Sequence, residues 1–324
     1  RVMQHLEYAR QWLWPELDVQ IVSISEQWAQ YAVAGPRARD TLKGVIDPGF
    51  DISNEAFPFL ACADVTVGGG IPARLFRISF SGELAYEIAV PAAYGDAAWR
   101  AIMAAGTPYG ITAYGSEALS VMRIEKGHAA GAEINGQTTA RDLGLGGMLA
   151  KKKDYVGRLM KERAALTDPQ RPILVGFKPV DEGQRLRAGS HFLGVGETPS
   201  LAADQGYLTS VAYSPSLKSW IGIGLIRGGT ERHGERVRAY DPVRGGDVEV
   251  DAVQHPGGAV VLDDAAQFDA AGRGGGAVPD PRYRWPTATG FGVMGGRAGR
   301  CARSGRIPGF PLSDGRQPCR YGMD

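Results

Sequence analysis

The sequence has few of the residues and patterns on which several classes of protein depend. It has 3 cysteines in 324 residues and no Cys-x-x-Cys pair, which excludes a disulfide scaffold, a zinc ribbon and a thioredoxin-type site. So little cysteine is typical of a reduced compartment, and we expect a cytoplasmic protein. No run of about twenty apolar residues occurs, so the sequence predicts no transmembrane helix and no membrane partner.

The sequence also has no excess of positively or negatively charged residues. Lys and Arg number 36 and Asp and Glu 35, which gives a formal net charge of +1. Proteins that bind nucleic acid or an anionic membrane surface usually carry a clear basic excess, so we expect neither partner.

The strong motifs for catalysis and nucleotide binding are also missing. There is no G-x-G-x-x-G between a strand and a helix, no Walker loop and no G-x-S-x-G elbow. Gly222 and Gly224 lie within an apolar strand pattern, where close backbone packing is the expected use. The five histidines are scattered without the spacing of a zinc site, so no metal is predicted. These absences indicate a protein that binds or transfers a polar organic ligand.

Strand and helix patterns are both present, which is typical of an α+β protein. The chain opens on an amphipathic helix with Leu6, Ala9 and Leu13 on one face. Further helices are predicted after Pro36, from Pro91, and from an N-cap at Ser116. Alternating, β-branched segments predict strands at 19–24, 28–34, 65–67, 74–78 and 86–90. Later short strands at 173–177, 206–212, 220–226 and 236–240 indicate a small barrel or sandwich.

These patterns divide the chain into an α/β domain at 1–165, a β-barrel domain at 166–256 and a tail at 257–324. Because the chain opens on Arg1 inside a helix, we expect that it is truncated at its N-terminus. The tail is rich in Gly, Arg and Pro, which predicts disorder. An RGG-like RNA-binding tail is one interpretation. Interrupting acids and irregular Gly-Arg spacing favour a frameshifted or fused tail without an evolved function.

The most informative segment is residues 76–88, which reads as a strand, a tight turn and a second strand. Side chains alternate along a strand, so Tyr86 and Ile88 share one face while Glu83 and Glu87 share the other. Glu87 therefore stands among apolar neighbours on a central strand, where an unpartnered carboxylate is costly.

Two interpretations of Glu87 follow. The first is an ion pair with a nearby arginine, such as Arg77 or Arg123. The second is ligand recognition, because a carboxylate accepts two parallel N–H bonds from a planar amino-heterocycle as it does from a guanidinium. A pterin presents such an edge.

Four motifs in order resemble the tetrahydrofolate-binding aminomethyltransferase family, which includes the T-protein of the glycine cleavage system. They are S-G-E-L-A-Y-E (81–87), Y-G-S-E-A-L-S-V-M-R-I-E-K-G (114–127), K-K-K-D-Y-V-G-R (151–158), and G-Y-L-T-S with Y-S-P-S-L-K (206–218). The second motif is more similar to one branch, the carboxy-terminal half of the alpha subunits of heterotetrameric sarcosine oxidases. Residues 25–29 and 33–38 also resemble that branch, and the resemblance covers about residues 1–256.

The resemblance implies a folate-binding fold with a ferredoxin-like α/β region and a C-terminal small β-barrel. Glu87 matches the glutamate that holds the pterin, and Tyr86 and Glu83 are its candidate neighbours in cofactor binding. The folate-site arginine of the T-protein motif A-R-D-x-L-R falls at Leu119, a departure from a plain T-protein, and its second arginine matches Arg123, which we expect to be structural. No match to the family's catalytic aspartate is found, so the catalytic residues stay unknown.

The implied function is that of the folate-binding part of a sarcosine oxidase alpha subunit. Sarcosine would be demethylated oxidatively to glycine, and its one-carbon unit would pass to tetrahydrofolate to give 5,10-methylenetetrahydrofolate. FAD, FMN and NAD would belong to the intact oxidase complex, with beta, gamma and delta subunits as partners. A run at Lys151, Lys152 and Lys153 is either FMN-phosphate-facing or, as we favour, solvated. The alternatives are a free-standing aminomethyltransferase and a non-catalytic folate-binding module of the same fold.

Overall fold

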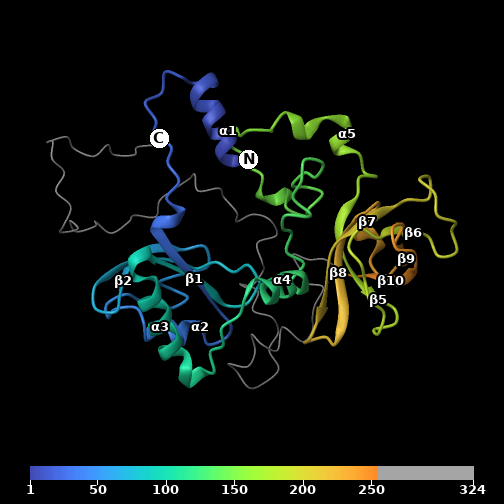
Figure 1. Cartoon of the computed structure of the whole chain (residues 1–324). Helices are drawn as coiled ribbons and strands as arrows, with labels where there is room; N and C mark the ends of the chain where they lie inside the picture. Colours follow the sequence, from blue (N-terminus) through green and yellow to red (C-terminus); the bar gives the residue numbers. More distant parts are fainter. Residues whose placement is uncertain (254–324) are drawn as a thin grey trace. The chain divides into compact units, whose positions relative to one another are not determined.

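The computed structural model describes residues 1–253, which form a four-stranded sheet with helices and a closed β-barrel (Figure 1). The mixed α+β class predicted from the sequence is confirmed. The predictions made for residues 257–324 lie outside the described residues. Between residues 1 and 253, no helix is both long and apolar enough to cross a membrane.

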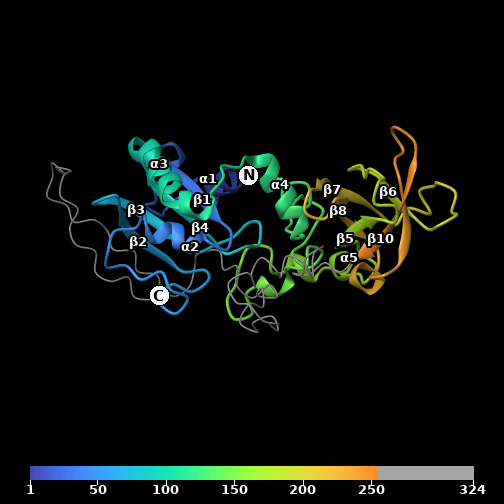
Figure 2. The same ribbon diagram turned by 90° about the horizontal axis from the view of Figure 1, so that it is seen from below.

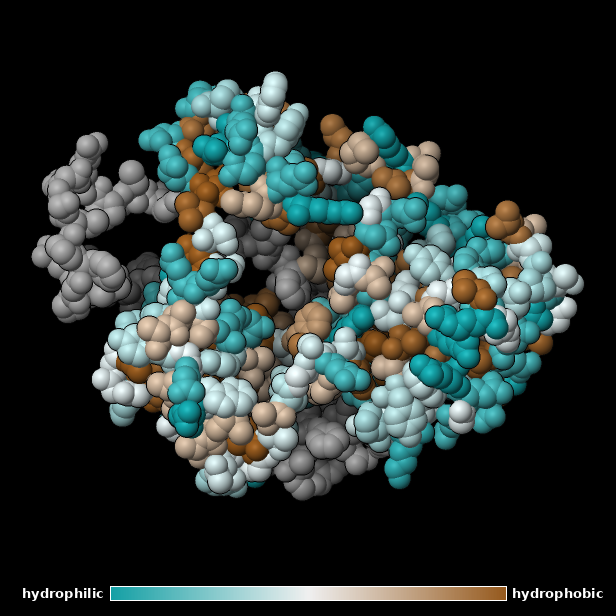
Figure 3. All heavy atoms as spheres, viewed as in Figure 1, coloured by the Kyte–Doolittle hydropathy of each residue, from teal (hydrophilic) through white to brown (hydrophobic). Residues whose placement is uncertain are grey.

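The helix predicted at the start of the chain is confirmed. α1 covers Val2–Tyr8 and continues directly into a π-helical turn, η1, over Ala9–Leu13. Ala9 is buried, whereas Trp12 is 75% exposed. Figure 3 shows hydrophobic residues, in brown, at the surface of this N-terminal segment.

The strand predicted at residues 19–24 is wrong. That segment is irregular and leads into a 3-10 turn, η2 (Ser25–Gln27). β-branched residues favour a strand only where a neighbouring strand and a packed face are available. No strand in the described part of the chain pairs with this segment, and Val22 is 73% exposed.

The sheet contains the other strands predicted in the first half of the chain. They are β1 (Trp28–Ala34), β2 (Cys62–Val67), β3 (Ile71–Phe76) and β4 (Ala85–Pro91). All neighbours are antiparallel, in the order β1-β4-β3-β2, so that β4 is an inner strand. The turn between β2 and β3 contains three consecutive glycines, 68–70, all with positive φ, a conformation that glycine adopts without strain.

Two helices cover one face of the sheet, α2 (Ala38–Lys43) and α3 (Gly95–Gly106) (Figures 1 and 2). Leu42 and Ile102 pack from these helices onto Leu75 and Ile88 of the sheet in one buried cluster. The second helix begins at Gly95 and not at Pro91, because Pro91 is extended and a 3-10 turn, η3 (Ala92–Tyr94), comes first. Another 3-10 turn, η4 (Thr107–Tyr109), follows it.

Helix α4 (Ser116–Glu125) forms where the sequence predicts it, with a different cap. Gly115 is the N-cap residue, and Ser116 is the first helical residue, without a side-chain capping hydrogen bond. The helix packs on the barrel, mainly against β7 and β8 (Figure 2). Its Ile124 is buried against the apolar residues of β8.

The barrel is closed, with strand order β10-β5-β8-β7-β6-β9. Its strands are β5 (Ile173–Pro179), β6 (His191–Leu193), β7 (Gly206–Ser214), β8 (Ser219–Ile226), β9 (Arg236–Tyr240) and β10 (Asp247–Val253). The expected close packing at Gly224 is confirmed, because a Cβ there would lie 2.6 Å from the carbonyl oxygen of Tyr207. A short 3-10 segment, η7 (Gly229–Arg232), joins β8 to β9.

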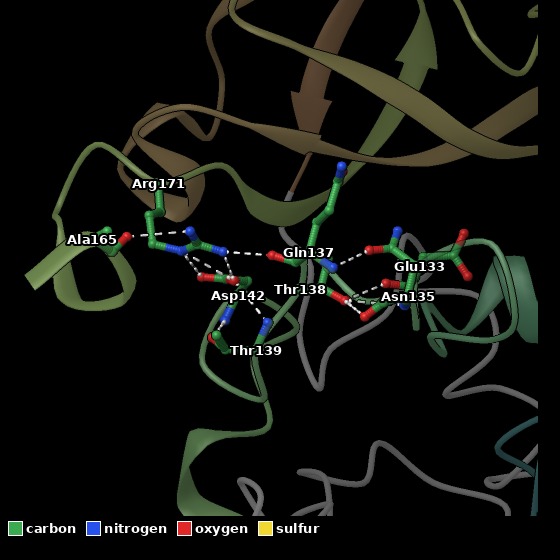
Figure 4. A network of polar contacts seen from close by, with 8 residues as sticks. All are labelled: Glu133, Asn135, Gln137, Thr138, Thr139, Asp142, Ala165 and Arg171. Atoms are coloured by element: carbon green, nitrogen blue, oxygen red, sulfur yellow. Dashed lines mark hydrogen bonds and ion pairs between the residues drawn. The ribbon is translucent and has the colours of Figure 1, made fainter. Parts of the chain in front are cut away.

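The long connection from α4 to β5 is mostly irregular, with short helical segments η5 (Gly146–Met148), η6 (Met160–Glu162) and α5 (Ala164–Thr167). One ion pair, Asp142 with Arg171, ties it to the start of the barrel (Figure 4). Arg171 donates to Asp142 Oδ1 at 3.0 Å and to the carbonyl oxygen of Gln137 at 2.8 Å. Asp142 also accepts the backbone N–H of Thr139 at 2.8 Å. The connection is therefore fixed by side-chain bonds in place of regular structure.

Candidate functional site

The candidate site lies on β4, the inner strand of the sheet. In the register of the sheet, Glu87 lies opposite Phe76 of β3 and Ala32 of β1. The predicted alternation is confirmed: Tyr86 and Ile88 are fully buried in the cluster under the helices, whereas Glu87 is partly buried. The carboxylate of Glu87 therefore belongs to the face of the sheet opposite α2 and α3.

The partner of Glu87 is an amide. Gln30 Nε2, on the neighbouring strand β1, donates a hydrogen bond to Glu87 Oε2. The predicted ion pair with Arg77 or Arg123 is wrong, because Arg77 Nη1 donates to the carbonyl oxygen of Phe57 at 2.9 Å and Arg123 pairs with Glu133. Among residues 1–253 no basic side chain forms an ion pair with Glu87. Its carboxylate is thus held by one N–H and keeps acceptor capacity.

Tyr86, its neighbour in sequence, faces the other way. Its hydroxyl accepts a hydrogen bond from Arg39 Nε at 2.9 Å, and its ring stacks on Phe57 with centroids 6.4 Å apart. The ring is fully buried in the helix-side core. The structure therefore does not bring Tyr86 together with Glu87.

Glu83 lies in the loop between β3 and β4, close to the predicted turn. Ser81 Oγ donates to Glu83 Oε2, and the backbone N–H of Gly82 donates to Ser79 Oγ at 2.8 Å. Gly82 has φ +102°, and a Cβ there would lie 2.6 Å from Lys126 Cδ, at the end of α4. The left-handed φ favours glycine at this point, and with any other residue the flexible side chain of Lys126 would also have to shift.

Tyr114 lies within electrostatic reach of both acids, although no local pattern in the sequence marks it as a site residue. Burial raises the pKa of the Tyr114 hydroxyl, and the negative charges of Glu83 and then Glu87 raise it further. These three residues, Glu83, Glu87 and Tyr114, are called the carboxylate–tyrosine cluster below. Tyr114 was part of a recognised motif, but only the fold shows that it approaches two acids 27 and 31 positions earlier.

The chemistry available to the carboxylate–tyrosine cluster is hydrogen bonding to a polar ring. Each carboxylate accepts N–H bonds, and a phenol with a raised pKa stays protonated and donates one. No group of three or more His, Cys, Asp and Glu side chains between residues 1 and 253 is arranged to hold a metal ion. The arrangement is therefore suited to recognise a ligand that presents amino and ring N–H donors.

The two other positions singled out on α4 have different surroundings. Leu119, where the T-protein motif has its folate-site arginine, is partly buried on α4. Arg123 is structural, as expected: Nη1 lies 3.0 Å from Glu133 Oε2, and Nη2 donates to Ser210 Oγ at 2.7 Å. Burial raises the pKa of Glu133, but hydrogen bonds from Ser210, Thr209 and Ala130 and the charge of Arg123 together hold it below its usual value.

Comparison with known proteins identifies two family models in the chain. Residues 1–153 match the GCVT N-terminal domain, and residues 173–257 match the glycine cleavage T-protein C-terminal barrel domain. The second match coincides with the closed barrel, and the first contains the sheet and the candidate site.

Several curated proteins are similar over most of these residues. The sarcosine oxidase subunit alpha of Rhizobium meliloti is 52% identical over 246 residues, which is 75% of this chain and 25% of that protein. The sarcosine oxidase subunit alpha of Corynebacterium sp. (strain P-1) is 41% identical over 251 residues, or 26% of its length. The chain thus spans about a quarter of the length of these relatives.

A further curated protein and a solved structure are also similar. The aminomethyltransferase of Streptomyces avermitilis is 32% identical over 207 residues, 62% of this chain and 52% of that protein. The crystal structure of glycine cleavage system aminomethyltransferase T from Bartonella henselae aligns with a TM-score of 0.49 and 16% identity, over 71% of this chain and 84% of that one.

Proposed function

The chain belongs to the glycine cleavage T-protein family, and we propose that it is the tetrahydrofolate-binding part of a sarcosine oxidase alpha subunit. The observation that carries the proposal is Glu87, a partly buried carboxylate on an inner strand with no cationic partner in the described residues. A reduced pterin supplies the paired N–H donors that such a carboxylate accepts.

The cluster around Glu87 supports this choice of ligand. Gln30 donates a hydrogen bond to Oε2 of Glu87, and a carboxylate has further acceptor positions on both of its oxygens. Glu83 adds a second acceptor, and the Tyr114 hydroxyl adds a donor beside them. A ring with both N–H and carbonyl groups satisfies all three, whereas a simple cation would leave the phenol without an acceptor.

The proposed reaction is oxidative demethylation of sarcosine to glycine, with the oxidation carried out at a flavin of a partner subunit. When bound, tetrahydrofolate would accept the one-carbon unit through N5 or N10 and leave as 5,10-methylenetetrahydrofolate. The task of this chain is to orient the pterin and to keep a reactive one-carbon unit from water. FAD, FMN, NAD and the beta, gamma and delta subunits belong to the proposal for the intact oxidase.

Leu119 favours the oxidase branch over a free-standing aminomethyltransferase. A plain T-protein has an arginine at this position of its A-R-D-x-L-R motif, and leucine cannot replace its charge or its N–H donors. Ammonia release from an aminomethyl-lipoyl carrier protein would identify a free-standing transferase. Neighbouring genes for flavoprotein beta, gamma and delta subunits would support the oxidase.

Binding of tetrahydrofolate to the Glu87→Ala and Glu87→Gln variants tests the proposal. We expect both variants to bind tetrahydrofolate about ten- to a hundredfold more weakly by anaerobic calorimetry, because a charge-assisted contact contributes about 1.5–3 kcal/mol. The Glu182→Gln variant alters an exposed loop acid and serves as the matched control. Unchanged affinity in both variants, with an unaltered circular dichroism spectrum, would refute the site.

A further inference from the structure

A second feature of the molecule, separate from the carboxylate–tyrosine cluster, is a hollow between α4 and one end of the barrel. It has a volume of about 800 Å³ and is lined by residues of α4, β7, β8, the segment before β6 and the turn between β9 and β10. Neither Glu83 nor Glu87 is among its lining residues. Nothing in the proposed function uses it.

Three arginines from the barrel converge on this hollow. Arg187 and Arg244 share one carboxylate, Asp241, at 3.4 and 3.6 Å. The backbone N–H of Arg244 lowers the pKa of Asp241 and offsets its burial, so this acid is ionised at neutral pH. One carboxylate therefore faces two guanidinium groups.

The third arginine has no acidic partner. The guanidinium carbon of Arg185 lies 5.1 Å from the ring centroid of Trp220, a cation–π contact. In the described part of the chain no carboxylate lies within 4.0 Å of it. This contact does not occupy the N–H groups of Arg185 with an acidic acceptor, and a guanidinium carries five such donors. Arg185 is thus held in place without being neutralised.

The other charged residues of the hollow do not cancel the positive charge of these three arginines. Arg123 also lines it, but Glu133 neutralises Arg123 in a buried pair. Glu117, on the α4 side, is the single acid among the lining residues. Three barrel guanidinium groups against Asp241 and Glu117 leave a net positive charge, beside the apolar surface of Trp220.

We propose that this hollow binds a small multivalent anion, one that carries two or more carboxylate or phosphate groups. Guanidinium groups match both kinds of oxyanion with paired N–H donors. Asp241 offsets the charge of one of the three barrel arginines, and in the described part of the chain Glu117 forms no ion pair with any of them, so a ligand with two oxyanion groups can contact two guanidinium groups at once.

Calorimetric titration of the full chain tests the proposal, with pyrophosphate and citrate as separate probes at matched ionic strength. We expect at least one probe to bind, and the double variant Arg185→Gln/Arg244→Gln to bind that probe about tenfold more weakly or worse. Both side chains are on the surface, so the variant keeps the fold. The control is Arg100→Gln, which alters an exposed arginine on α3. Arg187 is left unchanged so that the buried Asp241 keeps one of its two guanidinium partners.

The two probes distinguish between the two kinds of oxyanion. Tighter binding of pyrophosphate assigns the hollow to phosphate groups, and tighter binding of citrate assigns it to carboxylates. Failure of the unmodified chain to bind either probe, or equal binding by the double variant, overturns the proposal. Tetrahydrofolate binding by the Glu87 variants is measured independently, so failure here leaves the proposed folate site standing.

Discussion

The guanidinium of Arg123 and the carboxylate of Glu133 lie 3.0 Å apart, with 9% and 0% of their side chains exposed. The hydroxyl of Ser210 joins the pair, accepting from Arg123 at 2.7 Å and donating to Glu133 at 2.6 Å. The backbone N–H of Ala130 fills a further acceptor position at 2.7 Å. Helix α4, the loop that follows it and barrel strand β7 therefore meet at one buried charge pair.

Removing one member of this pair is expected to destabilise the protein severely. The Glu133→Gln variant leaves the Arg123 charge buried without a counter-ion, which costs about 3–5 kcal/mol of the free energy of unfolding. Urea denaturation followed by tryptophan fluorescence measures the loss.

A double variant separates the charge from the packing. In Arg123→Met/Glu133→Leu both charges are gone, and we expect the loss to be smaller than in Glu133→Gln alone, because no unpaired charge is buried. A double variant that is less stable than the single one would show that the hydrogen bonds with Ser210, and not the charge balance, hold α4 to the barrel.

Asp142 predicts a pH dependence of stability. Burial raises its pKa, but the hydrogen bond and charge of Arg171 and the hydrogen bonds from Thr139 outweigh burial, so its folded-state pKa lies below the ordinary value of 3.8. A carboxyl with a depressed folded pKa stabilises the fold above its unfolded pKa and loses that contribution as the pH falls through the folded value. We expect the melting temperature to fall steeply below about pH 4.

The Asp142→Asn variant checks this assignment. It should be less stable at neutral pH, and its melting temperature should fall less steeply than that of the unmodified chain between about pH 5 and pH 2. Two parallel curves would mean that other acids cause the acid sensitivity. Asp154→Asn, at an exposed and irregular position, is the matched control.

The two acids of the carboxylate–tyrosine cluster are expected to affect the ionisation of Tyr114. Because the charges of Glu83 and Glu87 raise the pKa of Tyr114, the Glu83→Gln/Glu87→Gln variant should lower that pKa toward the ordinary value of 10.0, with the part due to burial remaining. Ultraviolet difference spectroscopy follows ionisation of the phenol, and Tyr114→Phe identifies its share of the signal. A Tyr114 pKa that stays where it was in the double variant would show that the two acids do not approach it.

Much of the fold follows from the sequence, because local pattern and tertiary environment agree. Alternation along β4 assigned Tyr86 to the core and Glu87 to the opposite face, and the register of the sheet confirms it. The close packing expected at Gly224 was equally local, since a glycine in an apolar strand signals a near backbone.

The predictions that are wrong concern residues whose structure depends on partners far away in the sequence. Residues 19–24 have strand propensity without a strand beside them, and propensity alone is insufficient. Arg77 was a reasonable partner for Glu87 by sequence distance, but its guanidinium is used by the carbonyl oxygen of Phe57. Gln30 joins the site through a hydrogen bond across the sheet and Tyr114 through the charges of the two acids, for which a single sequence carries no local signal.

The opposed orientations of Tyr86 and Glu87 have a consequence for how this protein can change over evolutionary time. The residue at position 86 is constrained by packing in the interior, because its side chain contacts Arg39 and Phe57. Position 87 is partly buried on the opposite face of the sheet, outside that core. Two adjacent positions are thus under different constraints. A substitution at position 87 can change the polar groups on the opposite face of the sheet while the fold is kept.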